Sequence, residues 1–199
     1  MTTSSNNQVA RILFKEIVPG DLRKIHAQSN DTPSGGGARD FRFGAFSRLQ
    51  PAIAKMFPFL EQEERRRGGR REVIDVFKGH FCWNDSYGNV QTKESFFEPP
   101  TDARPSEGRI VRVHEYGCFD TSLMPHGGVG NRVLLLLIQL SDDSVWPYYA
   151  EERTLRAAGY WDPLVANVLL ACLDAHRPVG HAAIGFKDFI TGDCYCNGK

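Results

Sequence analysis

The chain has 199 residues, of which 41% are hydrophobic and 24% charged, so it can bury the core of an ordinary globular domain. Its 24 basic and 24 acidic residues cancel, which argues against a protein coated in positive charge. The charge is unevenly spread, because residues 11–71 hold 13 basic and 7 acidic residues (+6) and the rest hold 11 and 17 (−6). A basic N-terminal third predicts a polyanionic partner, unless the fold interleaves the two parts.

We expect residues 1–10 to form a disordered N-terminal tail, since they are mostly small and polar, and residues 11–199 to form a single globular domain. The five cysteines are an odd number and no secretory segment opens the chain, which predicts a reducing, cytoplasmic setting. The apolar run at 133–140 is too short to cross a bilayer. We therefore expect no membrane association.

The first third of the chain predicts two strands and a helix. Residues 11–18 are apolar and β-branched, as in a strand, and a turn with a short helix capped by Asp21 follows. Residues 41–43 predict a short strand with both phenylalanines facing inward. Residues 45–57 carry apolar side chains at helical spacing, and we expect the regular helix to begin at Pro51.

A glycine-rich segment precedes the predicted strand at 41–43. Residues 35–37 are three glycines, which allow close approach of the backbone to a ligand, and Asn30, Asp31 and Ser34 favour turns. Arg39 and Arg42 follow, so we expect a mobile loop that binds the anionic backbone of a nucleic acid. The alternative is a tight connection whose arginines are merely solvated. A nucleotide-hydrolysing phosphate loop is not expected, because the Gly-Lys-Ser/Thr ending is missing.

A second basic segment, Arg-Arg-Arg-Gly-Gly-Arg-Arg, occupies residues 65–71 and predicts a hairpin tip or an exposed loop. Arginine binds phosphates with two parallel hydrogen bonds, so this segment is a second candidate for phosphate contacts. The alternative is a solvated loop that Glu61, Glu63 and Glu64 partly neutralise.

The rest of the chain reads mainly as strands, and two helices are predicted near its end. Strands are expected at 73–83, 90–97, 108–116, 133–140, 145–149, 181–189 and 194–196, and helices at 151–158 and 162–176. Strands in antiparallel succession do not form alternating βαβ units. We therefore expect an α+β fold, a β-rich pseudobarrel or curved mixed sheet with two or three flanking helices.

Two groups of residues are candidates for metal binding or catalysis. Cys194 and Cys196 could bind zinc together with His80 and Cys82 if their strands meet. The spacing is unlike that of a zinc finger, however, so we expect buried thiols, no metal and no cofactor.

The candidate residues for a hydrolase or nuclease site are His80, His114, Glu115 and His126. No local catalytic signature accompanies these residues. We therefore expect a protein without enzymatic activity, with the hydrolase or nuclease as the alternative.

The stretch Asn30-Asp31-Thr32, followed by Ser34-Gly35 and another glycine, resembles the Asn-Asp-Thr-Gly-x-Thr-Gly motif of the EcoRII-type N-terminal domain. Pro33 stands where that motif has a glycine, and Ala38-Arg39 stand where it has a His-Gln pair. The resemblance implies a β-pseudobarrel that binds DNA for a restriction endonuclease. No nuclease domain is evident, so it implies a stand-alone recognition module in restriction-modification or antiviral defence.

Together these features predict a DNA-binding module that contacts the phosphate backbone through a glycine-rich and an arginine-rich loop. The predicted contacts are Asn30, Asp31, Thr32, Ser34, Arg39, Arg42, Arg65, Arg66, Arg67, Arg70 and Arg71. The alternative is a protein-interaction subunit whose arginine loop binds an acidic partner.

Overall fold

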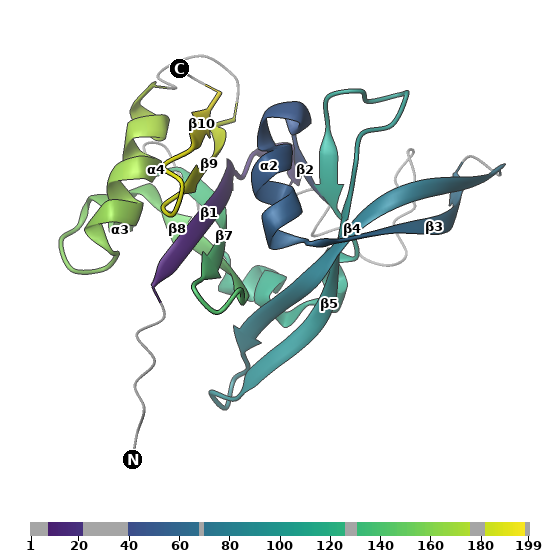
Figure 1. Ribbon diagram of the computed structural model, residues 1–199. Coiled ribbons are helices and arrows are strands. Elements are labelled where there is room, and N and C mark those ends of the chain that lie inside the picture. Colours follow the sequence, from purple (N-terminus) through teal and green to yellow (C-terminus); the bar gives the residue numbers. More distant parts are fainter. Residues whose placement is uncertain (1–7, 22–39, 68–69, 126–130, 176–181, 198–199) are drawn as a thin grey trace.

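The computed structural model describes residues 8–21, 40–67, 70–125, 131–175 and 182–197, and for residues 65–67, 70 and 121 it describes the backbone alone. The fold is α+β, dominated by one curled sheet (Figure 1). The strands are β1 (Val9–Glu16), β2 (Phe41–Phe43), β3 (Phe59–Arg67), β4 (Arg70–Asn84), β5 (Val90–Glu98), β6 (Gly108–Ile110), β7 (Val133–Leu140), β8 (Val145–Glu151), β9 (Ile184–Asp188) and β10 (Cys194–Cys196).

Nine of these strands follow one another in the order β10-β9-β1-β7-β8-β4-β5-β6-β2, and β3 pairs with β4 outside this path. Neighbouring strands are antiparallel, except that β4 and β8 meet in a parallel bridge between Phe81 and Val145. The helices are α2 (Phe46–Met56), α3 (Glu152–Arg156) and α4 (Pro163–Ala175), with the 3₁₀ helices η1 (Val113–Glu115), η2 (Gly117–Phe119) and η3 (Thr121–Leu123). The predicted class, a β-rich curved mixed sheet with flanking helices, is confirmed.

Strand β7 lies inside the sheet and explains the continuous apolar run of the sequence. Leu135 and Leu137 pack into a core rich in phenylalanine, which also contains the face of α2. Leu134 and Leu136 point to the opposite side, where α4 covers the sheet. A strand buried on both faces has no polar side to alternate with.

Several local predictions are confirmed by the structure. Phe41 and Phe43 of β2 are fully buried, and β7 and β8 form the expected hairpin. Helix α4 begins after Asp162, whose Oδ1 accepts a hydrogen bond from the amide of Leu164 (2.8 Å). That is the N-cap predicted from the Asp-Pro pair.

Three predicted boundaries differ from the structure. Strand β1 begins at Val9, within the segment 1–10 assigned to the tail, because Ala10 is buried. Helix α2 begins at Phe46 rather than at Pro51, since Phe46 and Leu49 are buried before the proline and their packing outweighs the one hydrogen bond that proline cannot make. Residues 19–21 are already helical, so Asp21 is not the N-cap that was predicted, and the rest of that helix lies outside the described residues.

The strand predicted at 108–116 ends at Ile110. Arg112 adopts a left-handed conformation (φ 58°), and the chain continues as 3₁₀ turns. Val113, Tyr116 and Phe119 are all buried at a spacing of three residues, which is the period of a 3₁₀ helix. Their apolar character therefore reflects helical turns rather than a strand.

The cysteines differ from the expected reduced state, because Cys172 of α4 and Cys196 of β10 form a disulfide. Cys82 and Cys118 are free and buried, and Cys194 is free and exposed. The bond forms because the C-terminal hairpin packs against α4, a contact that cysteine spacing does not reveal. Among the helices that the structure describes, none is long and apolar enough to span a bilayer.

Candidate nucleic-acid interface

The candidate interface is a two-stranded ribbon that β3 and β4 form on one side of the sheet (Figure 1). The antiparallel pairing runs without interruption from Phe59 opposite Lys78 to Arg67 opposite Arg70. The hairpin tip predicted for the arginine segment is therefore confirmed. The alternative of an exposed loop is wrong, because the ladder places the arginines on strands and leaves only residues 68–69 between them.

The outer part of this ribbon has two strands only. β4 pairs with β3 over residues 70–78 and with β5 over residues 77–84. Within the described part of the chain, no further strand pairs with β3 or with residues 70–76 of β4. The nine residues of β3 correspond to about 30 Å of extended chain.

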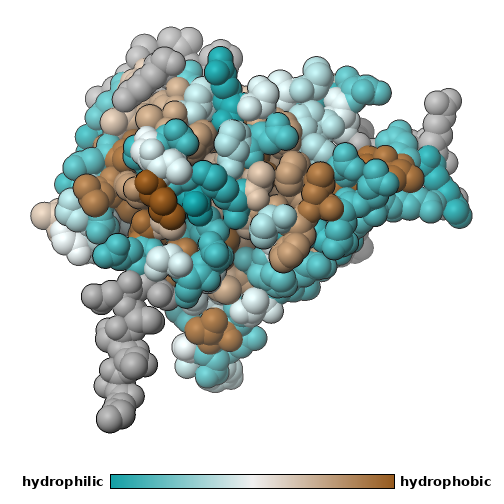
Figure 2. Space-filling view, viewed as in Figure 1, coloured by the Kyte–Doolittle hydropathy of each residue, from teal (hydrophilic) through white to brown (hydrophobic). Residues whose placement is uncertain are grey.

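Charge is separated along the ribbon. Residues 65–71 contain five arginines and no acidic residue, and we call this segment the arginine tip. The remainder of residues 59–78, the stem, contains five acidic residues and one lysine. The basic residues lie at the tip of the ribbon and the acidic residues lie in its stem. The positive potential is therefore concentrated at the tip. Figure 2 shows mainly hydrophilic residues along the ribbon, with a hydrophobic patch among them.

Ion pairs engage several of the stem carboxylates. Lys78 Nζ lies 2.6 Å from Glu61 Oε2 and 3.0 Å from Glu63 Oε1, and hydrogen bonds to these carboxylates raise the pKa of Lys78. Arg71 lies 3.2 Å from Glu64, and both side chains are largely exposed. An exposed pair of this kind is weak, so Arg71 can exchange Glu64 for a phosphate at little cost.

Arg42, which was predicted to contact phosphates, lies in a carboxylate network at the β2–β6 edge. Its Nε is 3.2 Å from Oδ1 of the fully buried Asp40, and its Nη1 is 3.7 Å from Glu107. Arg109 binds the same Asp40 (3.1 Å) and Glu98 (2.6 Å). Burial would lower the pKa of Arg109, but Glu98 and Asp40 outweigh it and raise that pKa. Arg42 therefore helps to neutralise the buried Asp40, and its phosphate contact stays a prediction.

The remaining predicted contacts, Asn30, Asp31, Thr32, Ser34 and Arg39, lie outside the described residues. Asp40 is the first described residue after them, and it leads directly into β2. Their role in binding therefore stays a prediction. So does the resemblance to the EcoRII-type domain that rests on them.

The four residues considered as a zinc site do not come together in the fold. Cys194 and Cys196 lie on β10, whereas His80 and Cys82 lie on β4, and four strands separate β10 from β4 in the sheet. Cys196 is also bonded to Cys172. Among the described residues, no group of three or more His, Cys, Asp or Glu side chains could hold a metal ion.

Among the residues of the alternative hydrolase or nuclease site, Glu115 makes an ion pair. Glu115 of η1 accepts a hydrogen bond from Lys93 (3.0 Å), which lowers the pKa of its carboxyl group. A carboxylate held in its charged form is a weak general base. His80 pairs with Glu94 in the β4–β5 ladder rather than with η1, and His126 lies outside the described residues. The hydrolase or nuclease alternative gains no support from these contacts.

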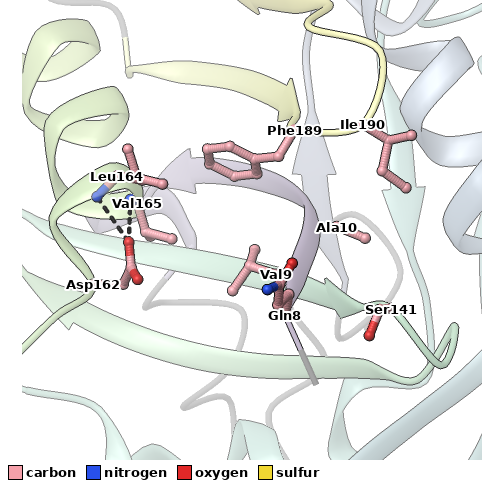
Figure 3. A pocket seen from close by; sticks show the side chains of 9 residues that line it. All are labelled: Gln8, Val9, Ala10, Ser141, Asp162, Leu164, Val165, Phe189 and Ile190. Carbon is pink, nitrogen blue, oxygen red and sulfur yellow. Dashed lines mark hydrogen bonds between the residues drawn. The ribbon is translucent and has the colours of Figure 1, made fainter. Parts of the chain in front are cut away.

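Sequence patterns did not indicate the depression of about 650 Å³ between the start of β1, the β7–β8 turn and α4 (Figure 3). Its walls are mostly apolar, with Val9, Val165 and Phe189 among them. Asp162 is the one carboxylate among the described residues that line it, and Figure 3 shows that its hydrogen bonds go to the first amides of α4. The depression therefore offers apolar surface rather than a reactive group.

Comparisons with models of known families, with curated proteins and with solved structures found no match to this chain. The candidate interface is accordingly assigned from its geometry and charge.

Proposed function

We propose that this protein is a DNA-binding module that contacts the phosphate backbone with the arginine tip of the β3–β4 ribbon. The observation that carries the proposal is a projecting two-stranded ribbon with five arginines at its end and acidic residues below them. Arginine is the side chain best suited to paired hydrogen bonds with phosphate oxygens. A free-standing end brings these charges to a polyanion without a clash from the sheet.

Duplex DNA fits the dimensions of the ribbon, because a major groove about 12 Å wide admits a two-stranded β-ribbon. The acidic stem would repel phosphates, so we expect only the arginine tip to enter. Contacts made mainly to phosphates position a protein but carry little sequence information.

Sequence recognition, if the EcoRII-type resemblance holds, would come from the segment at 30–34. The cellular role that we propose on that basis is restriction or antiviral defence.

A protein-interaction subunit is the second candidate, and exposed apolar side chains on the ribbon favour it. Leu60 and Val73 are 59% and 66% exposed, and their register positions lie on the same face of the ribbon as Gln62 and Asp75. Phosphates offer no partner for such side chains. An acidic protein with an apolar strip would satisfy both the arginine tip and these residues.

Titration of a labelled 20-base-pair duplex and the matching single strand at two salt concentrations separates the candidates. Five phosphate contacts predict a slope of about −4.5 in log affinity against log salt, and hence a loss of about 500-fold between 50 and 200 mM salt. Replacement of all five tip arginines with glutamine should abolish binding at 50 mM salt.

A triple variant with glutamine at residues 65–67 should reduce that slope by about 2.7. The matched control removes three exposed cations elsewhere, Arg48, Lys93 and Arg104, and should retain the wild-type slope. Equal losses in the two triple variants would mean that net charge, rather than the ribbon, governs binding. Wild-type protein that binds neither oligonucleotide at 50 mM salt would favour the protein-interaction subunit.

A further inference from the structure

Three of the five cysteines border one cavity of about 410 Å³ between α4 and the β9–β10 hairpin. Cys172 comes from α4, and Cys194 and Cys196 come from β10. Cys172 and Cys196 are joined as a disulfide, whereas Cys194 keeps a free and exposed thiol. A disulfide and an accessible thiol beside the same cavity are the two reactants of thiol–disulfide exchange.

The position of Cys194 on β10 favours attack of its sulfur on Sγ of Cys172 rather than on Sγ of Cys196. Residues 194 and 196 occupy alternate positions of β10, so they lie on the same face. Their Cα atoms in an extended strand are about 6.8 Å apart, which is the upper limit for a disulfide. A bond between neighbours on β10 is therefore disfavoured, which leaves Cys172, on the same cavity, as the residue whose sulfur Cys194 attacks.

We propose that Cys172, Cys194 and Cys196 form a thiol–disulfide exchange site. The Cys194 thiolate attacks Sγ of Cys172, a bond forms between these two sulfurs, and the bond between Cys172 and Cys196 breaks. The electron pair leaves with Cys196, which takes up the proton that Cys194 had released to solvent. The number of disulfides is unchanged, so no oxidant is consumed. A small disulfide of the glutathione class would enter the same cycle by reaction with the Cys194 thiolate, which releases one small thiol. A small thiol would enter by attack on the Cys172–Cys196 disulfide.

The contacts of Cys196 and Asn197 with β9 favour the Cys172–Cys196 disulfide over the Cys172–Cys194 disulfide. Asn197 donates its backbone amide to the Ile184 carbonyl (3.0 Å), and its side-chain oxygen accepts from the Ile184 amide (2.8 Å). Cys196 lies opposite Gly185 in the ladder, and a Cβ on Gly185 would come within 2.3 Å of the Tyr195 carbonyl oxygen. This close packing holds Cys196 in place. Exchange to Cys194 removes the disulfide that ties Cys196 to α4, so it couples the choice of disulfide partner to the docking of residues 196–197.

The two remaining cysteines supply an internal control. Cys82 and Cys118 are buried away from the cavity, and burial raises the pKa of Cys118 to about 12. Both should therefore resist alkylation while the protein is folded. Labelling of either thiol reports unfolding.

The first test is Cys196→Ser in a buffer of reduced and oxidised glutathione, followed by alkylation, digestion and mass spectrometry. We expect a Cys172–Cys194 disulfide, with Cys82 and Cys118 unlabelled before denaturation. The control Cys194→Ser should keep the Cys172–Cys196 bond. Folded Cys196→Ser protein that carries glutathione on Cys194, or in which both Cys172 and Cys194 are alkylated, would overturn the proposal.

The wild-type protein provides a second measurement that does not depend on how the variant folds. With a trace of thiol at pH 8, rapid acid trapping should yield a minor fraction with Cys172 bonded to Cys194 and Cys196 free. Detection of the Cys172–Cys196 bond alone after prolonged incubation would contradict exchange.

Discussion

Residues 70–75 and residues 76–84 belong to one continuous strand, β4, but they lie in different environments. In the inner part, the Phe81 ring lies 5.7 Å from the ring of Phe57, 5.3 Å from Tyr116 and 5.5 Å from Phe119. In the outer part, Val73 is 66% exposed, and Arg71 pairs with the exposed Glu64.

This difference separates stability from the proposed binding function. The inner part of β4 anchors the sheet through buried aromatic rings, whose packing is sensitive to any change of volume. The outer part carries charges whose loss leaves no cavity. Variants of the ribbon should therefore report on binding, and variants of the sheet should report on folding.

The largest effect is expected for Phe81→Ala. Removal of a fully buried ring should lower the free energy of unfolding by about 3–5 kcal/mol. Val73→Ala, on the outer part of the same strand, should change it by no more than about 0.5 kcal/mol. Urea denaturation followed by circular dichroism measures both values. A loss of several kcal/mol in Val73→Ala would show that Val73 is packed against other side chains. The outer part of β4 would then stabilise the fold as the inner part does.

A second prediction compares a buried and an exposed ion pair through pH. Burial alone would raise the pKa of Glu152, but hydrogen bonds from Arg132 and Arg156 outweigh it and lower the pKa from 4.5 to about 2. The ion pairs of Glu152 therefore stabilise the fold above pH 4.5, by an amount on the order of 3 kcal/mol. That contribution should be lost as the pH falls from about 5 to 2.

Glu152→Gln tests this expectation, with Glu64→Gln on the ribbon as the matched control. The difference in unfolding free energy between wild type and Glu152→Gln should be largest at pH 7 and should shrink toward pH 2. Glu64→Gln should follow the wild-type curve, because its carboxylate is exposed. A constant difference between wild type and Glu152→Gln at all pH values would mean that Glu152 contributes through packing rather than charge.

The smallest effect is expected for Glu64→Gln on binding. The substitution removes a carboxylate 3.2 Å from Arg71, so duplex affinity at 50 mM salt should rise by about two- to fivefold, the size of one exposed ion pair. Glu115→Gln removes a carboxylate of η1 that is paired with Lys93 and is not part of the ribbon, and it should leave affinity unchanged. Weaker duplex binding by Glu64→Gln would show that Glu64 does not compete with phosphates for Arg71.

Local sequence patterns were sufficient for several elements. The Asp-Pro pair predicted the start of α4, because an N-cap acts within one turn, and the alternation at 41–43 predicted which phenylalanines are buried. The two glycines at 68–69 between arginine blocks predicted the tip of the ribbon. In each case the deciding interaction lies within a few residues along the chain.

Tertiary structure decided the features that depend on distant partners. Arg109 binds Asp40 across 69 residues, which places Arg42 in the same carboxylate network, and Cys172 meets Cys196 only because the C-terminal hairpin packs on α4. The spacing of Val113, Tyr116 and Phe119 became a 3₁₀ series because all three face one core. Hydrophobic periodicity and turn chemistry report the backbone near each residue, whereas the partners of a buried charge or thiol depend on how the whole sheet closes.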